Sequence, residues 1–146
     1  MKVRQANMRD RNEFVRLANL FLKESNYPFQ INLMKLIDSF AKGVDSPYFN
    51  ILVLEKEGGL GGMLVGALNQ PLFSNDLVST ELAWFVEKEF RNSKEAIKLL
   101  VEYEAWAKEC GCKFITMVDI DSLESLQPLY ERKGYTLTEK TYVKEL

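Results

Sequence analysis

Residues 81–111 constrain the fold of this 146-residue chain more than any other stretch, because a strand pattern leads directly into a long amphipathic helix pattern. Residues 81–86 are apolar, aromatic and finally β-branched, which favours a strand. Further on, one helical face carries apolar residues at steps of three and four, namely Ala96, Leu99, Leu100, Tyr103, Trp106, Ala107 and Cys110. The polar residues 87–93 lie between the two patterns. A strand, a short loop and a helix N-terminus predict an anion site, since free backbone N–H groups and the helix dipole converge there.

The remaining patterns predict an α+β fold with helices layered on both faces of a mixed sheet. Asn7 is expected to cap a first helix, with Asp10 completing a capping box, and Gly43 is expected to end a second helix over residues 32–41. A short helix is expected over residues 122–133. Strands are expected at residues 2–6, 49–55, 63–68, 78–86 and 113–118, with one or two more between 135 and 144. The sheet should therefore have six or seven mostly antiparallel strands, about four helices, and a parallel fourth and fifth strand joined by the long helix.

Composition narrows the classes of function. A chain of this length fits one domain, residues 1–146. The net charge of −2 argues against nucleic-acid binding, and no apolar run is long enough to span a membrane. The chain has no histidine, which removes Ser-His-Asp chemistry and most zinc sites. No metal site is expected, and the Cys110 and Cys112 thiols, with no secretory leader, indicate a cytoplasmic protein.

Three stretches in this order resemble the GNAT superfamily of N-acetyltransferases. Residues 81–86 with Phe90 and Arg91 look like that family's fourth strand and the entry to its pyrophosphate loop. The helix pattern up to Gly111 looks like the helix that follows the loop. Residues 129–135, Leu-Tyr-Glu-Arg-Lys-Gly-Tyr, are similar to the family's closing motif. The resemblance covers the whole chain and implies transfer of an acyl group, most simply acetyl from acetyl-CoA, to an amine.

The resemblance also implies where acetyl-CoA binds. Its pyrophosphate would lie on the loop and its pantetheine arm along the fourth strand, which assigns cofactor binding to Phe85, Val86, Arg91, Asn92, Ser93, Lys94, Glu95 and Ala96. The family has glycine where this chain has Lys94. Asn92 is then expected to take the left-handed backbone conformation, because asparagine tolerates it best. Lys94 either adds a charge toward the pyrophosphate or blocks the site.

Two residues are candidates for the proton transfers. By the resemblance, Tyr130 would protonate the CoA thiolate, and Glu81 would take the proton of the amine. Simple strand alternation places Glu81 on one face with Ala83 and Phe85. The plainer interpretations are a tyrosine that packs on the sheet and an exposed charge at a strand end. Asp119 and Asp121 are rival bases, or else attract a cationic amine.

The acceptor site is the least constrained part of the prediction. Tyr27 and Phe29 would form its walls, or would instead latch onto the sheet as hydrophobic residues. The resulting hypothesis is an N-acetyltransferase in which a primary amine, on a small molecule or a protein, attacks acetyl-CoA directly in a ternary complex. The alternative is a catalytically weak or inactive protein of the same fold that acts as a CoA-binding or interaction module. A homodimer is a further expectation from the resemblance.

Overall fold

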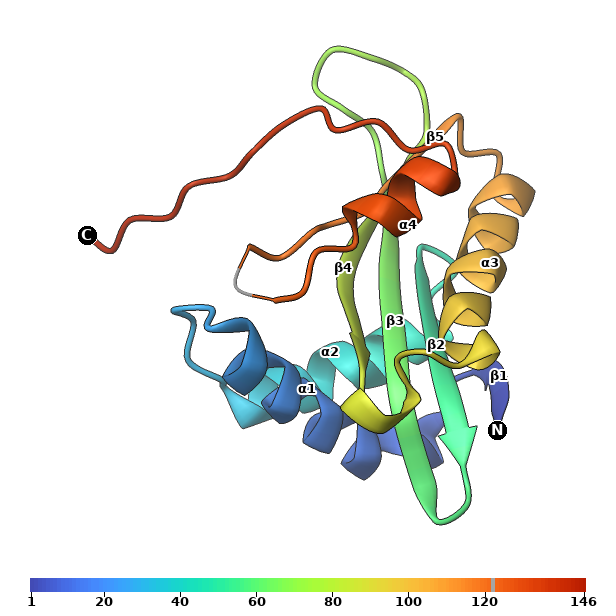
Figure 1. The fold of residues 1–146 in the computed structure, drawn as a ribbon, viewed down its shortest axis with the longest axis vertical. Coiled ribbons are helices and arrows are strands. Elements are labelled where there is room, and N and C mark those ends of the chain that lie inside the picture. Colours follow the sequence, from blue (N-terminus) through green and yellow to red (C-terminus); the bar gives the residue numbers. More distant parts are fainter. Residues whose placement is uncertain (122) are drawn as a thin grey trace.

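A five-stranded sheet forms the centre of the molecule (Figure 1). The computed structural model describes residues 1–121 and 123–146. The strands follow chain order across the sheet and are β1 (Lys2–Gln5), β2 (Phe49–Lys56), β3 (Gly59–Asn69), β4 (Val78–Val86) and β5 (Phe114–Thr116). Strands β1 to β4 pair antiparallel, whereas β4 and β5 pair parallel, so the predicted parallel crossover is confirmed.

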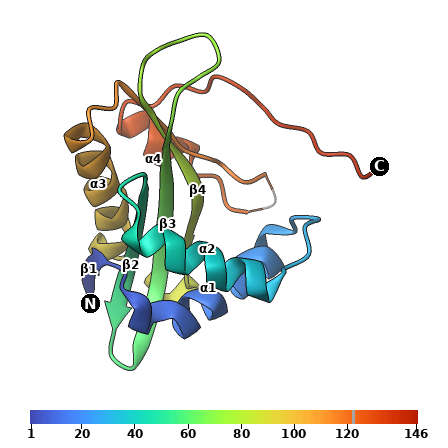
Figure 2. The ribbon, with the colours of Figure 1, turned by 180° about the vertical axis from the view of Figure 1, so that it is seen from behind.

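Helices cover both faces of this sheet. The chain enters through the short turn η1 (Met8–Asp10), where the predicted capping box forms between Asn7 and Asp10. Helices α1 (Arg11–Ser25) and α2 (Leu33–Asp45) lie on one face, and α3 (Lys94–Glu109) and α4 (Gln127–Arg132) lie on the other, as Figures 1 and 2 show. In the described part of the chain, no helix is both long and apolar enough to cross a membrane.

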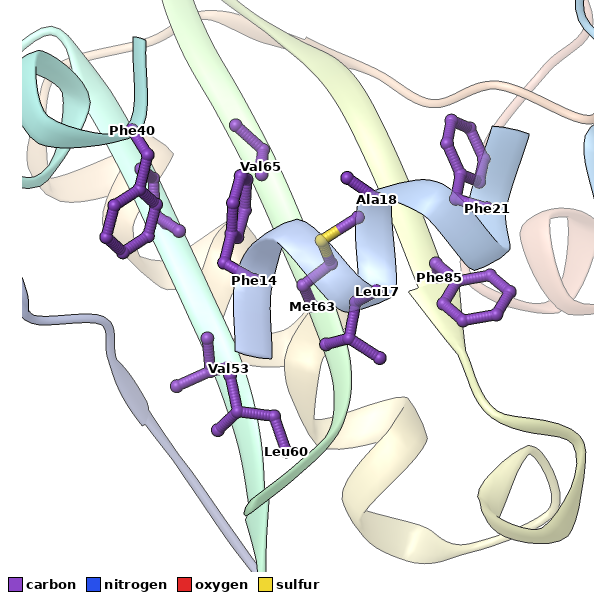
Figure 3. Close-up of a cluster of buried hydrophobic side chains, with 11 residues drawn as sticks. Phe14, Leu17, Ala18, Phe21, Phe40, Val53, Leu60, Met63, Val65 and Phe85 are labelled. Carbon is purple, nitrogen blue, oxygen red and sulfur yellow. The ribbon is translucent and has the colours of Figure 1, made fainter. Parts of the chain in front are cut away.

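Each face of the sheet has its own apolar core. On the face of α1 and α2, Phe14, Leu17 and Phe21 of α1 point toward the sheet and meet Met63 and Phe85 (Figure 3). On the other face, the predicted stripe of α3 buries its apolar side chains against β2 and β3, in the cluster that contains Leu52, Leu64, Val86, Ala96, Leu99, Leu100 and Tyr103. The helical period read from the sequence therefore identified the inner face of α3 correctly.

One expected helix end and the expected number of strands are wrong. Helix α2 continues past Gly43 to Asp45, because this glycine packs against the sheet, where an added Cβ would lie 3.0 Å from Ile51 Cδ1. Helix α4 begins at Gln127, and the expected earlier start at Ser122 lies outside the described residues. Among the described residues, the sheet has five strands rather than six or seven, because residues 136–146 form no strand and extend away from the body (Figures 1 and 2).

Candidate active site

The candidate site lies where β4 and β5 separate. Their ladder holds three residue pairs and ends at Thr80 opposite Thr116. Immediately after it, the backbone N–H of Val118 donates a 2.8 Å hydrogen bond to Glu81 Oε2. The Tyr130 hydroxyl donates a 2.7 Å hydrogen bond to the carbonyl of the same Val118. The two residues that sequence analysis selected for proton transfer therefore meet at one residue of the segment that follows β5.

A β-bulge in β4 determines which way Glu81 points. In the register with β3, Glu81 lies opposite Gly66 and Ala83 lies opposite Val65, so Leu82 is an extra residue. A Cβ on Gly66 would collide with the ring of Tyr103, so position 66 faces α3, and its cross-strand partner Glu81 does too. The expectation that Glu81 shares a face with Ala83 and Phe85 is therefore wrong, because the bulge shifts the alternation by one residue.

Glu81 is a buried carboxylate with a strongly altered acidity. Its exposure is 6%, and burial raises its pKa to about 7, although the hydrogen bond from Val118 opposes this shift. Burial and the nearby Glu81 charge raise the pKa of Tyr27, which packs on Phe21 of α1. The same two causes raise the pKa of Tyr130, which lies on the side of α3 and α4. The charge of Glu81 therefore influences one tyrosine on each face of the sheet.

Tyr130 is held in an aromatic cluster. Its ring lies 6.4 Å from that of Trp84 and 5.5 Å from that of Tyr135. Burial is the main cause of its raised pKa, so the phenol stays protonated across the physiological range. The Trp84 Nε1 donor is buried beside this cluster and has no hydrogen-bond partner among the described residues. No pattern in the sequence indicated this unpaired donor.

The loop after β4 ends in a capped helix N-terminus. The Ser93 side chain accepts a 3.1 Å hydrogen bond from the backbone N–H of Ala96, and α3 begins at Lys94 with an exposed side chain. Among the described residues, Asn26 is the one non-glycine residue with positive φ. The expected left-handed conformation at Asn92 is therefore absent, because Lys94 is already a residue of the right-handed helix. In this backbone, position 94 does not require glycine.

Three other cofactor candidates are already engaged by the protein. Arg91 donates to the carbonyl of Val86 at 2.7 Å and to Glu24 Oε2 of α1 at 2.5 Å. The side chains of Phe85 and Val86 are buried in the two opposite cores. A cofactor could therefore contact these residues only through the backbone of β4. Neither the role of Glu24 nor that of Val118 was suggested by the sequence, because a glutamate or a valine in a sequence does not indicate which residue it contacts in the fold.

The acceptor candidates lie in the segments that follow α1 and β5. Phe29 stacks on Tyr27 with ring centroids 5.7 Å apart, and 63% of Phe29 is exposed. Asp119 accepts hydrogen bonds from Ser125 Oγ and from the Leu126 N–H, so it organises the segment before α4. Asp121 is exposed. The structure thus places these residues near the ends of α1, β5 and α4, while Glu81 and Tyr130 are the pair that it brings together.

The fold and this pair define an α+β class of protein built around an opening between two parallel strands, with a helix N-terminus beside it. The sequence profile described as the acetyltransferase (GNAT) family matches residues 14–135. The chain therefore belongs to the GNAT acetyltransferase family, whose general chemistry is acyl transfer. No match was found among curated proteins.

Solved structures share this fold over nearly their full lengths. A transcriptional regulator from Bacillus halodurans C-125 has a TM-score of 0.81 at 17% identity, covering 99% of each chain. A predicted acetyltransferase from Clostridium acetobutylicum, solved with acetyl-CoA, has a TM-score of 0.80 at 17% identity, covering 99% of this chain and 95% of that one. An aminoglycoside 6'-N-acetyltransferase from Acinetobacter haemolyticus has a TM-score of 0.75 at 17% identity, covering 100% and 99%. At these identities the likeness shows the fold.

Proposed function

We propose that the protein transfers an acetyl group from acetyl-CoA to a primary amine by direct attack in a ternary complex. One observation carries this proposal. A buried carboxylate whose pKa is raised to about 7 and a protonated tyrosine are joined through Val118 at the opening between β4 and β5. A base with a pKa near neutrality and a separate acid are what amine acylation needs.

Several backbone features fit acetyl-CoA as co-substrate. Within the described residues, the edge of β4 beyond Thr80 has no strand partner, so its amide groups, apart from the Val86 carbonyl that Arg91 contacts, can pair with the two amides of the pantetheine arm. The N-terminus of α3 offers backbone N–H groups and a positive dipole end to the pyrophosphate. The orphaned Trp84 Nε1 supplies a further donor near Tyr130. Residues 91–96 would act mainly through their backbone, with Lys94 adding charge.

The proton transfers follow from the acidities. An alkylammonium has a pKa of about 10, so the amine must lose a proton before it attacks. Glu81, ionised above about pH 7, takes this proton directly or through a water molecule. The amine nitrogen then bonds to the thioester carbonyl carbon, while N–H groups of β4 stabilise the developing oxyanion. When the C–S bond breaks, Tyr130 turns from the Val118 carbonyl and donates its proton to the CoA thiolate, and the proton that the acylated nitrogen then loses restores the phenol.

The test measures acetyl-CoA binding and CoA release separately. Acetyl-CoA binding is followed by calorimetry, and the free thiol of CoA is followed colorimetrically with a panel of amines. Tyr130→Phe should lower kcat about 100-fold, while the Kd for acetyl-CoA stays within about twofold, because the hydroxyl acts on the leaving thiolate. Tyr135→Phe is the matched control, since its hydroxyl binds Glu104 rather than Val118.

Two outcomes would overturn parts of this proposal. Unchanged turnover in Tyr130→Phe would remove this residue from the mechanism. Acetyl-CoA binding without turnover on any amine would favour the alternative of a CoA-binding module. Arg91 gives that alternative some support, because its pairing with Glu24 withholds a cation from the phosphates.

A further inference from the structure

An open apolar cavity of about 270 Å³ lies between α1, α2 and the sheet. Of its lining residues in the part of the chain that the structure describes, only Ser39 has a polar side chain. Three of the large apolar lining residues are exposed, namely Ile31, Phe49 and Leu82, with exposures of 38%, 40% and 53%. A closed core would bury such side chains. The cavity therefore opens to solvent through an entrance lined by apolar side chains.

The bulge in β4 connects this cavity to the reacting groups. Leu82 and Ala83 are consecutive residues, yet both line the cavity, which a regular strand does not allow because its side chains alternate. Glu81 precedes them and lies in the strand opening, where its charge raises the pKa of Tyr27 on the side of α1. Along β4, the wall of the cavity therefore begins at the residue that follows the base.

We infer that the acceptor is an amphipathic amine, in which a primary amino group is attached to an aromatic or branched apolar group that occupies this cavity. The inference rests on the proposed function and names the class of its substrate. An apolar cavity of about 150 Å³ holds one benzene ring, so this larger one accommodates a phenylalkyl or bicyclic group. The ammonium end lies toward Glu81, whose carboxylate favours a cation before its deprotonation.

The first experiment compares amines that differ in their apolar group. The series is ethanolamine, butylamine, 2-phenylethylamine and tryptamine, with spermidine as a polar polycation. The kcat/KM with acetyl-CoA should rise by about tenfold from ethanolamine to butylamine and again to 2-phenylethylamine, because each enlargement fills more of the apolar cavity. Equal or better turnover of ethanolamine or spermidine would overturn the inference.

The second experiment fills the cavity. Ala18 lines it from α1 and Ser39 lines it from α2, so Ala18→Leu and Ser39→Leu should each raise the KM for 2-phenylethylamine about tenfold without changing the Kd for acetyl-CoA. Ala105→Leu is the matched control, because this alanine is exposed on α3. Ser39 is itself exposed, so its variant folds even where Ala18→Leu overpacks the core. An unchanged KM in Ser39→Leu and in folded Ala18→Leu would contradict the inference.

Binding without acetyl-CoA separates this inference from the proposed function. The Kd of 2-phenylethylamine is measured by ligand-observed NMR on the free protein and on both variants. If acyl transfer is absent but the amine binds and Ser39→Leu weakens its binding, the cavity site stands and the transferase proposal falls. If acyl transfer occurs but 2-phenylethylamine neither binds nor reacts better than ethanolamine, the transferase proposal stands and the apolar acceptor falls.

Discussion

At the scale of single residues, the peptide groups of Val118 organise the chemistry. Its N–H contacts the carboxylate of Glu81 and its C=O contacts the hydroxyl of Tyr130. Neither contact involves the valine side chain, so the arrangement depends on where the backbone passes and not on residue type. This explains why a single sequence could suggest both partners, yet gave no signal for the residue between them.

The acidity of Glu81 predicts how stability changes with pH. Its pKa rises from 4.5 to about 7 on folding, so the folded protein holds a proton that the unfolded chain releases. The associated stability is therefore present below about pH 4.5 and is lost as the pH rises through about 7. Glu81→Gln should remove this loss and raise the free energy of unfolding at pH 8 by as much as about 3 kcal/mol.

Urea unfolding of both proteins at pH 5 and pH 8 measures this difference. Asp38→Asn is the control, because Asp38 is an exposed carboxylate paired with Lys42 on α2. A Glu81→Gln protein that loses as much stability between the two pH values as the unchanged protein would contradict a raised pKa. The same acidity predicts that kcat/KM rises with pH toward a plateau above about 7, as the base ionises.

At the scale of elements, the junction of β4 and α3 combines stability with anion binding. Ser93 is the N-cap of α3, and its hydroxyl group accepts the Ala96 N–H. Ser93→Ala should lower the free energy of unfolding by about 1 kcal/mol, because this N–H loses its partner.

Ser93→Asp separates the two roles of this residue. Aspartate caps a helix as well as serine does, so the free energy of unfolding should be retained. Its negative charge would repel the pyrophosphate and raise the Kd for acetyl-CoA several-fold. Urea unfolding and calorimetry measure the two effects. An unchanged Kd in Ser93→Asp would place the phosphates away from the N-terminus of α3.

A helix or strand could be predicted from the sequence where its own residues carry the periodic pattern. The bounds of β4 and the buried stripe of α3 follow from local periodicity and are correct. The bulge at Leu82 was not predictable, because it is a relation between β3 and β4 that neither strand carries alone. Gly43 was mistaken for a helix end, because its close approach to Ile51 is a tertiary contact.

The difference between local patterns and tertiary contacts also explains which parts of the site and of the chain end could be predicted. Tyr27 and Phe29 were expected to form the acceptor walls and remain candidates, whereas the neighbouring Ile31 lines the cavity. An exposed aromatic and a cavity wall look alike in sequence, because only packing distinguishes them. Residues 135–144 have strand-forming composition, yet a strand exists only when it pairs.

At the scale of the whole molecule, ion pairs link the helical layer of α1 to the loop beyond β4. Arg16 of α1 contacts Glu87 at 2.6 Å, and Glu24 at the end of the same helix holds Arg91. Glu87 and Arg91 both belong to the loop that leads to the proposed phosphate site. The layer that borders the acceptor cavity is thus electrostatically joined to the loop that would hold the co-substrate.

This linkage predicts a gain of affinity on removal of a charge. Glu24→Gln releases the Arg91 guanidinium toward the phosphates, so the Kd for acetyl-CoA should fall about threefold at low salt and the gain should shrink at high salt. Glu102→Gln changes the net charge equally but lies on α3, where it pairs with Lys98. Calorimetry at two salt concentrations compares them. Weaker binding in Glu24→Gln would mean that Glu24 positions Arg91 rather than withholding it.

The extra residue in β4 has a consequence for which changes this strand can tolerate. The carboxylate at position 81 and the cavity wall at 82 and 83 lie on their present sides because of how many residues the strand contains, not because of which ones. Substitution at position 82 would thus tune the acceptor, whereas deletion of one residue would turn every later side chain of β4 to the opposite face. In a lineage of such proteins, insertions and deletions here should be far rarer than replacements.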